Sequence, residues 1–108
     1  MAAMSSIPNL SPNEASARVL SGAVLLDVRE LDEWQSGHVV GAVHVPLGEL
    51  ASRATELPRD HEIVVMCLSG GRSQVACGML ARSGFGPVAN VSGGITAWVR
   101  AGLPTARG

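Results

Sequence analysis

Short apolar runs alternate with helix-forming segments along most of the chain, and this alternation constrains the fold more than any other feature. The runs at 23–28 and 63–67 are almost continuously apolar, as expected of strands that are buried on both faces. Shorter strand candidates lie at 42–45 and 87–91. Strands that alternate with helices favour parallel pairing through right-handed crossovers. We therefore predict an α/β fold, with helices on both faces of one parallel sheet.

Capping and stop signals mark the predicted helices. Ser11-Pro12-Asn13-Glu14 has the pattern of a capping box with proline at the first helical position, and Gly22 supplies the stop. Further helices are predicted at 30–36, 47–57, 74–83 and 95–100, each followed within two residues by glycine or proline. In the helix at 74–83, the spacing predicts an inward side formed by Val75, Cys77, Met79 and Leu80. The pattern does not give the order of the strands in the sheet.

Length and composition predict one domain. Of the 108 residues, 46% are apolar and 16% are charged, which suffices for one core. The formal charge is −1, and the eight basic residues are scattered arginines, so neither nucleic acid nor an anionic membrane is an expected partner. The sequence has neither a signal-like N-terminus nor an apolar run long enough to cross a membrane, which predicts a cytoplasmic protein. Its two cysteines, Cys67 and Cys77, do not form the pattern of a disulfide-rich secreted domain, so free thiols are predicted.

A glycine-rich loop follows the central apolar run and begins with a cysteine. Ligands of open α/β sheets bind beyond the carboxyl ends of the strands, which is where Cys67 falls. Gly70 and Gly71 allow successive backbone N–H groups to turn toward one point, and the next helix adds the positive end of its dipole. With the guanidinium of Arg72, these groups favour a thiolate over a thiol. We predict that Cys67 is ionised at neutral pH.

Such a loop suits a compact anion held on sulfur. A persulfide adds one sulfur atom to Cys67, and the loop N–H groups could hold its charge as an oxyanion hole holds oxygen. The predicted reaction has two steps: a donor transfers sulfur to Cys67, and an acceptor then removes it. The predicted substrate-binding residues are Leu68, Ser69, Gly70, Gly71, Arg72 and Ser73. The histidines show no ligand spacing, so neither a metal site nor a cofactor is predicted.

At these residues the chain resembles the rhodanese family of single-domain sulfurtransferases. Three segments agree in order: Leu26 to Ala42, with Asp27-Val28-Arg29-Glu30 and Gly37-His38; Cys67 to Ser73; and Gly93 to Pro104, with Gly93-Gly94-Ile95-Thr96-Ala97-Trp98. The resemblance covers about residues 11–105. It implies a five-stranded parallel sheet with an edge strand near 5–10, in which an edge position tolerates Pro8.

The resemblance also implies roles for the loop. Cys67 matches the persulfide-bearing cysteine, the backbone from Leu68 to Ser73 matches the sulfur cradle, and Arg72 matches the loop-closing arginine. Members active on thiosulfate often carry a basic residue where this chain has Leu68. The implied activity is transfer of sulfane sulfur from thiosulfate or a persulfide to cyanide, a thiol or a protein acceptor.

Two other functions remain open from the sequence. One is a sulfur carrier or binding module that works only with a partner protein. The other is a cysteine phosphatase, which is less favoured because related phosphatases have five residues between cysteine and arginine, whereas this loop has four.

Several chemically capable side chains are predicted to be structural. Cys77 lies inside a predicted helix and is interpreted as core. Asp27 and Arg29 are interpreted as a charged pair that braces loops, and His38 as a packing residue with a hydrogen bond. Trp34 and Trp98 are interpreted as core or boundary anchors.

Overall fold

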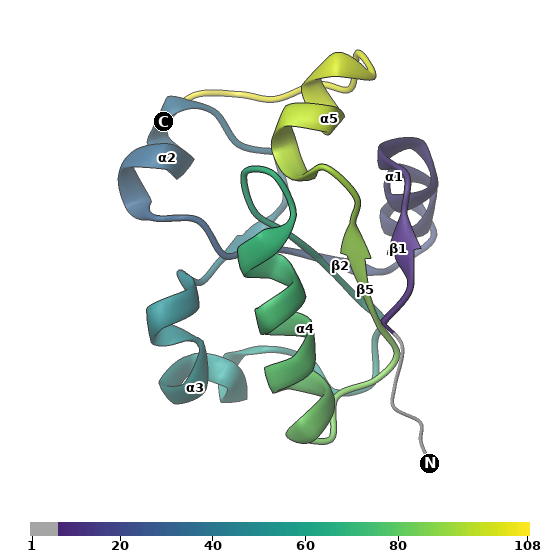
Figure 1. The fold of residues 1–108 in the computed structure, drawn as a ribbon, viewed down its shortest axis with the longest axis vertical. Helices are drawn as coiled ribbons and strands as arrows, with labels where there is room; N and C mark the ends of the chain where they lie inside the picture. Colours follow the sequence, from purple (N-terminus) through teal and green to yellow (C-terminus); the bar gives the residue numbers. More distant parts are fainter. Residues whose placement is uncertain (1–6) are drawn as a thin grey trace.

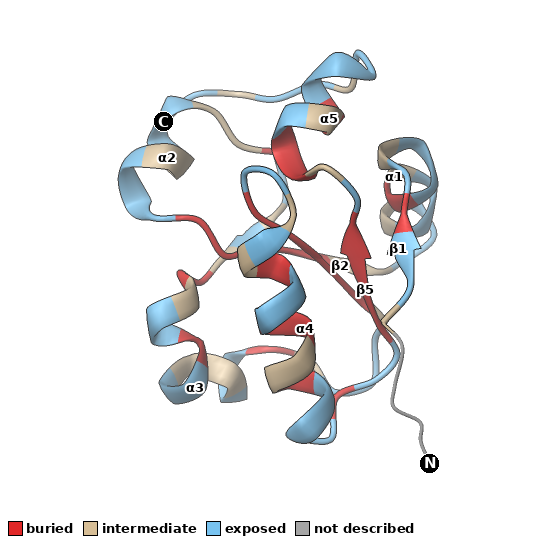
Figure 2. Ribbon diagram, in the orientation of Figure 1, coloured by how far each residue is buried: buried red, intermediate tan, exposed pale blue. Residues whose placement is uncertain are grey.

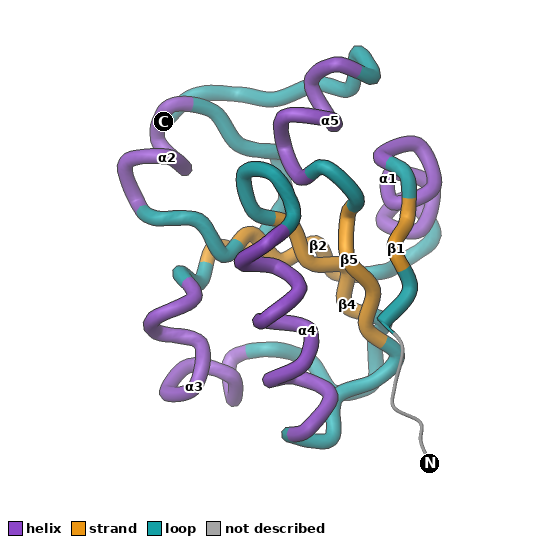
Figure 3. Tube along the Cα trace, in the orientation of Figure 1, coloured by secondary structure: helices purple, strands orange, loops and turns teal. Residues whose placement is uncertain are grey.

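Five strands pair in parallel in one sheet, in the order β1-β5-β4-β2-β3. The computed structural model describes residues 7–108. Its strands, drawn in orange in Figure 3, are β1 (Asn9–Leu10), β2 (Val24–Asp27), β3 (Val43–His44), β4 (Ile63–Met66) and β5 (Val88–Val91). The predicted α/β fold with a five-stranded parallel sheet is confirmed. The implied edge strand is the short β1, whereas Ser5 and Ser6 lie outside the described residues.

Helices cover both faces of this sheet, as predicted. They are α1 (Pro12–Leu20), α2 (Leu31–Ser36), α3 (Leu50–Arg53), α4 (Gly71–Arg82) and α5 (Gly94–Arg100). Figure 1 shows α3 and α4 on one side of the strands and α1 and α5 on the other, with α2 near the C-terminus. Among the described residues, no helix is long and apolar enough to cross a membrane.

Two buried apolar clusters hold the layers together. One joins α3 and α4 to the sheet and includes Val65, Leu80 and Cys67, whereas the other joins α1 and α5 to the opposite face and includes Val64 and Trp98. Successive residues of a strand point to opposite faces, so β4 supplies both clusters alternately. Figure 2 shows the central strands and the inward sides of the helices among the buried parts of the chain, whereas the edge strand β1 is partly exposed. This packing fixes the end of β4, where the cysteine loop begins.

The local signals at the first helix act as predicted. Ser11 Oγ accepts the Glu14 N–H at 3.1 Å, and Glu14 Oε1 accepts the Ser11 N–H at 2.8 Å. Gly22 follows with a φ of 116°, a left-handed conformation that glycine adopts without strain. A similar capping box at Glu30 and Glu33 begins α2.

Two predictions about helices are wrong in detail. The segment 47–57 is not one helix: a 3₁₀ turn at Leu47–Glu49, the short α3 and a second 3₁₀ turn at Ala54–Glu56 follow one another. In α4, Val75 is 55% exposed, and the buried side is formed by Ser73, Ala76, Cys77 and Leu80. The helix begins at Gly71, and Cys77 and Leu80 are buried as predicted, whereas Val75 is not.

Candidate functional site

The candidate site lies in the turn between β4 and α4. Cys67 follows the last residue of β4 and is 1% exposed. Gly70 has a φ of 115° and serves as the N-cap of α4, which allows its N–H to turn back and donate to Cys67 Sγ at 3.1 Å. Ser73, in the first turn of α4, places its hydroxyl oxygen 3.4 Å from the same sulfur. The turn therefore surrounds the sulfur with polar groups.

Two opposing effects set the pKa of Cys67. Burial raises the pKa because it penalises the charged thiolate, while hydrogen bonds from the Ser73 side chain and from the backbone at Ser73, Gly70 and Ser69 lower it. The hydrogen bonds prevail, and the pKa lies below that of an ordinary thiol. Donors within the turn thus favour the nucleophilic form of this cysteine.

The guanidinium of Arg72 is held by a carboxylate from another helix. It donates two hydrogen bonds to Glu33 of α2, from Nη1 at 2.7 Å and from Nη2 at 2.9 Å. These two hydrogen bonds from Arg72 lower the pKa of Glu33 to about 2, although partial burial of the carboxylate acts in the opposite direction. The sequence predicted that Arg72 adds charge beside the sulfur, but it did not identify Glu33, which lies 39 residues away along the chain.

The N-terminus of α5 fixes the backbone of the loop from behind. The Ile95 N–H donates to the Cys67 carbonyl at 2.9 Å, and the Thr96 N–H donates to the Leu68 carbonyl at 3.2 Å. A Cβ on Gly94, whose φ is 59°, would lie 2.4 Å from the Cys67 carbonyl oxygen. This approach requires glycine and gives a physical reason for the Gly-Gly pair that precedes α5.

A polar chain runs from the sulfur to the edge of the sheet. The Ser73 hydroxyl donates a short hydrogen bond to Asn90 Oδ1 of β5, and Asn90 Nδ2 donates to Asn9 Oδ1 of β1 at 2.9 Å. Asn9 Oδ1 also accepts a hydrogen bond from Gln74 Nε2 at 2.7 Å. Asn90 is 2% exposed, and the sequence analysis missed it. The available signal was an amide inside an apolar strand, since a buried amide requires hydrogen-bond partners.

The loop residues differ in their exposure. Leu68 is 46% exposed, Ser69 and Gly71 are also exposed, Gly70 and Arg72 are partly buried, and Ser73 is buried. Of the predicted set, Ser73 and Gly70 contact Cys67 Sγ through hydrogen bonds. An exposed apolar side chain thus directly follows the cysteine in the chain.

The other candidates have the structural roles that the sequence analysis assigned. Arg29 contacts both carboxylate oxygens of Asp27 and donates to the carbonyls of Glu33 and Gly37, which braces the β2–α2 segment. His38 Nδ1 donates to the Trp34 carbonyl at 2.9 Å.

The aromatic anchors also lie where they were expected. The Trp34 ring stacks on that of His38, with 3.8 Å between the ring centroids, and on that of His44 at 4.7 Å. Trp98 is 3% exposed. These aromatic rings support the fold around the site.

The second cysteine lies in the core. Cys77 is fully buried in α4, and burial raises its pKa to about 12. Both cysteines are free thiols. Within residues 7–108, no group of three or more histidine, cysteine or acidic side chains is arranged to hold a metal ion.

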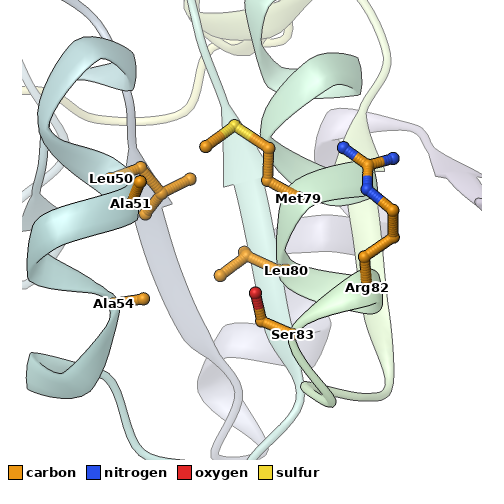
Figure 4. A pocket seen from close by; sticks show the side chains of 7 residues that line it. All are labelled: Leu50, Ala51, Ala54, Met79, Leu80, Arg82 and Ser83. Carbon is orange, nitrogen blue, oxygen red and sulfur yellow. The ribbon is translucent and has the colours of Figure 1, made fainter.

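Two hollows flank the region. One, of about 460 Å³, lies between α2 and α5 and includes Glu33, the partner of Arg72, together with Thr96 and Arg100. The other, of about 260 Å³, lies between α3 and α4 and is lined by Leu50, Met79 and other residues that Figure 4 shows. No loop residue from 67 to 73 lines the second hollow. No loop residue lines the first hollow either, but its residues Ile95 and Thr96 donate hydrogen bonds to the carbonyls of Cys67 and Leu68, which places it beside the candidate site.

Comparison with known proteins shows the family. The family model described as Rhodanese-like domain matches residues 11–101. The chain belongs to the rhodanese-like domain family. The resemblance stated from the sequence is confirmed, and the sequence motifs correspond to the β4–α4 turn and to the N-terminus of α5.

Relatives of this rhodanese-like chain carry names that refer to sulfur. The chain is 43% identical over 96 residues to YrkF of Bacillus subtilis (strain 168), which is named as a proposed sulfur carrier protein. The match covers 87% of this chain and 52% of YrkF, so the chain spans about half of that relative. It is 36% identical over 95 residues to the thiosulfate sulfurtransferase GlpE of Pseudomonas savastanoi pv. phaseolicola (strain 1448A / Race 6), covering 88% of this chain and 90% of GlpE.

A solved structure shares the whole fold. The rhodanese-related protein from Thermoplasma volcanium superposes with a TM-score of 0.85 and 28% sequence identity, over 92% of this chain and 97% of that one. The chain therefore shares its fold with a rhodanese-related protein over nearly its whole length.

Proposed function

We propose that this rhodanese-like domain is a sulfurtransferase in which Cys67 carries sulfane sulfur as a persulfide. The observation that carries the proposal is the environment of Cys67 Sγ, which receives the Gly70 N–H at 3.1 Å and lies 3.4 Å from the Ser73 hydroxyl. These donors favour a thiolate, the form that attacks sulfur. The relatives named for sulfur transfer and sulfur carriage give independent support.

With thiosulfate as donor, the first step forms one sulfur–sulfur bond and breaks another. The Cys67 thiolate attacks the outer sulfur of thiosulfate, and sulfite leaves with the electron pair of the broken bond. The product is a Cys67 persulfide with one negative charge on its terminal sulfur. Backbone N–H groups of the turn stabilise that charge by hydrogen bonding, as in an oxyanion hole.

The second step returns the cysteine to its starting form. Cyanide or a thiolate attacks the terminal sulfur, and the Cys67 thiolate leaves with the electron pair of the persulfide bond. Thiocyanate or an acceptor persulfide is released. Because the starting thiolate is the leaving group, the same hydrogen bonds from Gly70 and Ser73 that lower the pKa of Cys67 assist this step.

Dependence on a partner protein is the second candidate function. Leu68, 46% exposed beside Cys67, places an apolar side chain at the entrance to the site. The similarity to YrkF, named as a proposed sulfur carrier, also favours this candidate. A carrier of this kind would accept sulfur from a small donor but release it slowly to cyanide.

Intact mass spectrometry after incubation with thiosulfate tests the proposal. We expect a gain of one sulfur atom that cyanide removes, no gain in Cys67→Ser, and an unchanged gain in the matched control Cys77→Ser. Gain from a small persulfide but not from thiosulfate would keep the chemistry and change the donor. A stable gain that cyanide does not remove would favour the carrier. The absence of gain with every donor, in protein that remains folded, would overturn the proposal.

A further inference from the structure

The Ser73 hydroxyl has one proton and three acceptors within reach. Its oxygen lies 3.4 Å from Cys67 Sγ and 3.1 Å from the Gly70 carbonyl oxygen, and it makes its shortest contact with Asn90 Oδ1. The Gly70 carbonyl also accepts the Gln74 N–H at 3.3 Å, so it has a second donor. The proton of a single hydroxyl group cannot serve the sulfur and the amide at the same time.

The arrangement in the structure is the one that suits a thiol. Ser73 donates to Asn90 Oδ1, so the Cys67 S–H must donate to Ser73 Oγ if that 3.4 Å contact is a hydrogen bond. Ionisation of Cys67 removes that proton to solvent. The thiolate can only accept, so the Ser73 proton must turn toward the sulfur.

That turn would leave two acceptors facing each other. Asn90 Oδ1 would then face a lone pair of Ser73 Oγ, at a residue that is 2% exposed and out of reach of water. Such a buried, unmatched contact is costly because neither oxygen has a proton to donate to the other. A half-turn of the Asn90 carboxamide removes the mismatch, because Nδ2 then donates to Ser73 Oγ.

We propose that Asn90 is a positioning residue whose carboxamide rotates when Cys67 ionises, so that its Nδ2 donates to Ser73 and the Ser73 hydroxyl donates to the sulfur. The outer end of the chain permits this rotation. Asn9 and Gln74 are exposed, so their amides can rotate in turn or bond to water. No atom is transferred along this chain of hydrogen bonds. Only the direction of each hydrogen bond, from donor to acceptor, reverses.

The inference rests on the proposed role of Cys67, but its test requires no sulfur transfer. The charged groups around the turn are Arg72 of α4 and its partner Glu33 of α2, and the Asp27–Arg29 pair lies at the end of the adjacent β2. Variants of Asn90 leave these groups in place. The rate of Cys67 alkylation by iodoacetamide as a function of pH reports ionisation directly.

The decisive variant is Asn90→Asp, because a carboxylate accepts hydrogen bonds but cannot donate to Ser73. We expect the pH at which Cys67 is half ionised to rise by about one unit. Well below that pH, Cys67 should then be alkylated about tenfold more slowly than in the unchanged protein. A buried charge would also oppose the thiolate by itself. Asn90→Asp in a Ser73→Ala protein measures the direct effect of the charge alone, because the hydroxyl that links residue 90 to the sulfur is absent. We expect Asn90→Asp to slow Cys67 alkylation clearly less in that protein. Equal slowing in both backgrounds would overturn the proposal.

A second variant keeps the test usable if Asn90→Asp does not fold. Asn9 is exposed, so the Asn9→Asp substitution does not bury a charge. The new carboxylate can only accept a hydrogen bond, so it should keep Asn90 Nδ2 pointing toward residue 9 and away from Ser73. We expect slower Cys67 alkylation that persists in 1 M salt, where the Debye length is about 3 Å, and that disappears with Ser73→Ala. Slowing that vanishes in salt would overturn the proposal. If Cys67 gains sulfur but the Asn90 and Asn9 variants do not change its alkylation, the rotation of the Asn90 carboxamide is rejected and the proposed function is not. If the variants slow alkylation as expected but Cys67 gains no sulfur from any donor, the proposed function is rejected and the rotation is not.

Discussion

The two cysteines of this small domain show how environment separates a reactive thiol from an inert one. Both side chains are buried, but Cys67 receives hydrogen bonds from the turn, while Cys77 is surrounded by apolar neighbours in α4. Burial alone raises the pKa of Cys77 to about 12, whereas hydrogen bonds bring that of Cys67 below its ordinary value. Their different environments predict different reactivities.

Alkylation across a pH series checks this difference. We expect iodoacetamide to modify Cys67 in the folded protein at a pH below that of an ordinary thiol, and to leave Cys77 unmodified until the protein unfolds. Cys77→Ala should leave the Cys67 profile unchanged and lower the free energy of unfolding by about 1 kcal/mol, because it creates a small cavity. Modification of Cys77 at neutral pH in folded protein would contradict this account.

The Glu33–Arg72 pair gives a pH dependence of stability. The pKa of Glu33 falls from 4.5 to about 2, so the folded state favours the carboxylate. Its contribution is present above pH 4.5 and is lost as the pH falls toward 2. We expect Glu33→Gln to lower the free energy of unfolding at pH 7 by roughly 1 kcal/mol, allowing for screening by solvent at both side chains.

Urea denaturation of Glu33→Gln beside the unchanged protein at several pH values measures this effect. The stability difference should shrink steadily below pH 4.5 and vanish only below pH 2, where Glu33 is protonated in the folded state as well. A difference that stays constant down to pH 2 would show that Glu33 acts by packing and not by charge.

At the scale of elements, local signals predicted most boundaries. The Ser11 capping box and the stop at Gly22 suffice to place α1, because the groups involved are close neighbours in sequence. The segment 47–57 has a stop at Pro58 but no capping box, and it forms three short helical pieces without a side-chain cap. The buried side of α4 follows helical spacing from Ser73 through Ala76, Cys77 and Leu80, and Val75 falls outside this spacing.

The junction between α5 and the turn gives a prediction at this scale. Gly94→Ala places a Cβ 2.4 Å from the Cys67 carbonyl oxygen at a φ of 59°, so the turn must move. We expect a loss of roughly 2–4 kcal/mol in unfolding free energy, from backbone strain and crowding together, and a higher pH for Cys67 alkylation.

Gly102→Ala is the matched control for that substitution. Gly102 follows the same helix and has a φ of 79°, but nothing lies within 4 Å of the added Cβ. It should cost about 1–2 kcal/mol from strain alone and leave Cys67 alkylation unchanged. Equal effects of the two substitutions on stability and alkylation would show that the contact with the turn is unimportant.

At the scale of the whole molecule, the sheet brings together residues that local patterns cannot connect. The sequence predicted Cys67 and its loop because they are contiguous. Glu33 contacts Arg72 across 39 residues, and Asn9 contacts Asn90 across 81. These contacts depend on the strand order β1-β5-β4-β2-β3, which alternation of strands and helices leaves open. Polar partners from distant elements were therefore the part of the site that the sequence analysis missed.

The buried Asp27–Arg29 pair links this architecture to the site. Arg29 joins the end of β2 to the carbonyls of Glu33 and Gly37, so it holds the segment that presents Glu33 to Arg72. Arg29→Met would leave the Asp27 carboxylate buried without its cation, and we expect a loss of about 3–5 kcal/mol in unfolding free energy, measured by urea denaturation.

Two further variants show whether charge or packing causes that loss. Asp27→Asn combined with Arg29→Met removes both charges, so we expect it to unfold at a higher urea concentration than Arg29→Met alone. Arg53→Met breaks only surface ion pairs with Glu49 and Glu56 and should leave the unfolding midpoint nearly unchanged. If the double variant recovers no stability, lost packing and lost hydrogen bonds to the β2–α2 segment explain the effect of Arg29. Recovery would instead identify the uncompensated carboxylate of Asp27 as its main cause.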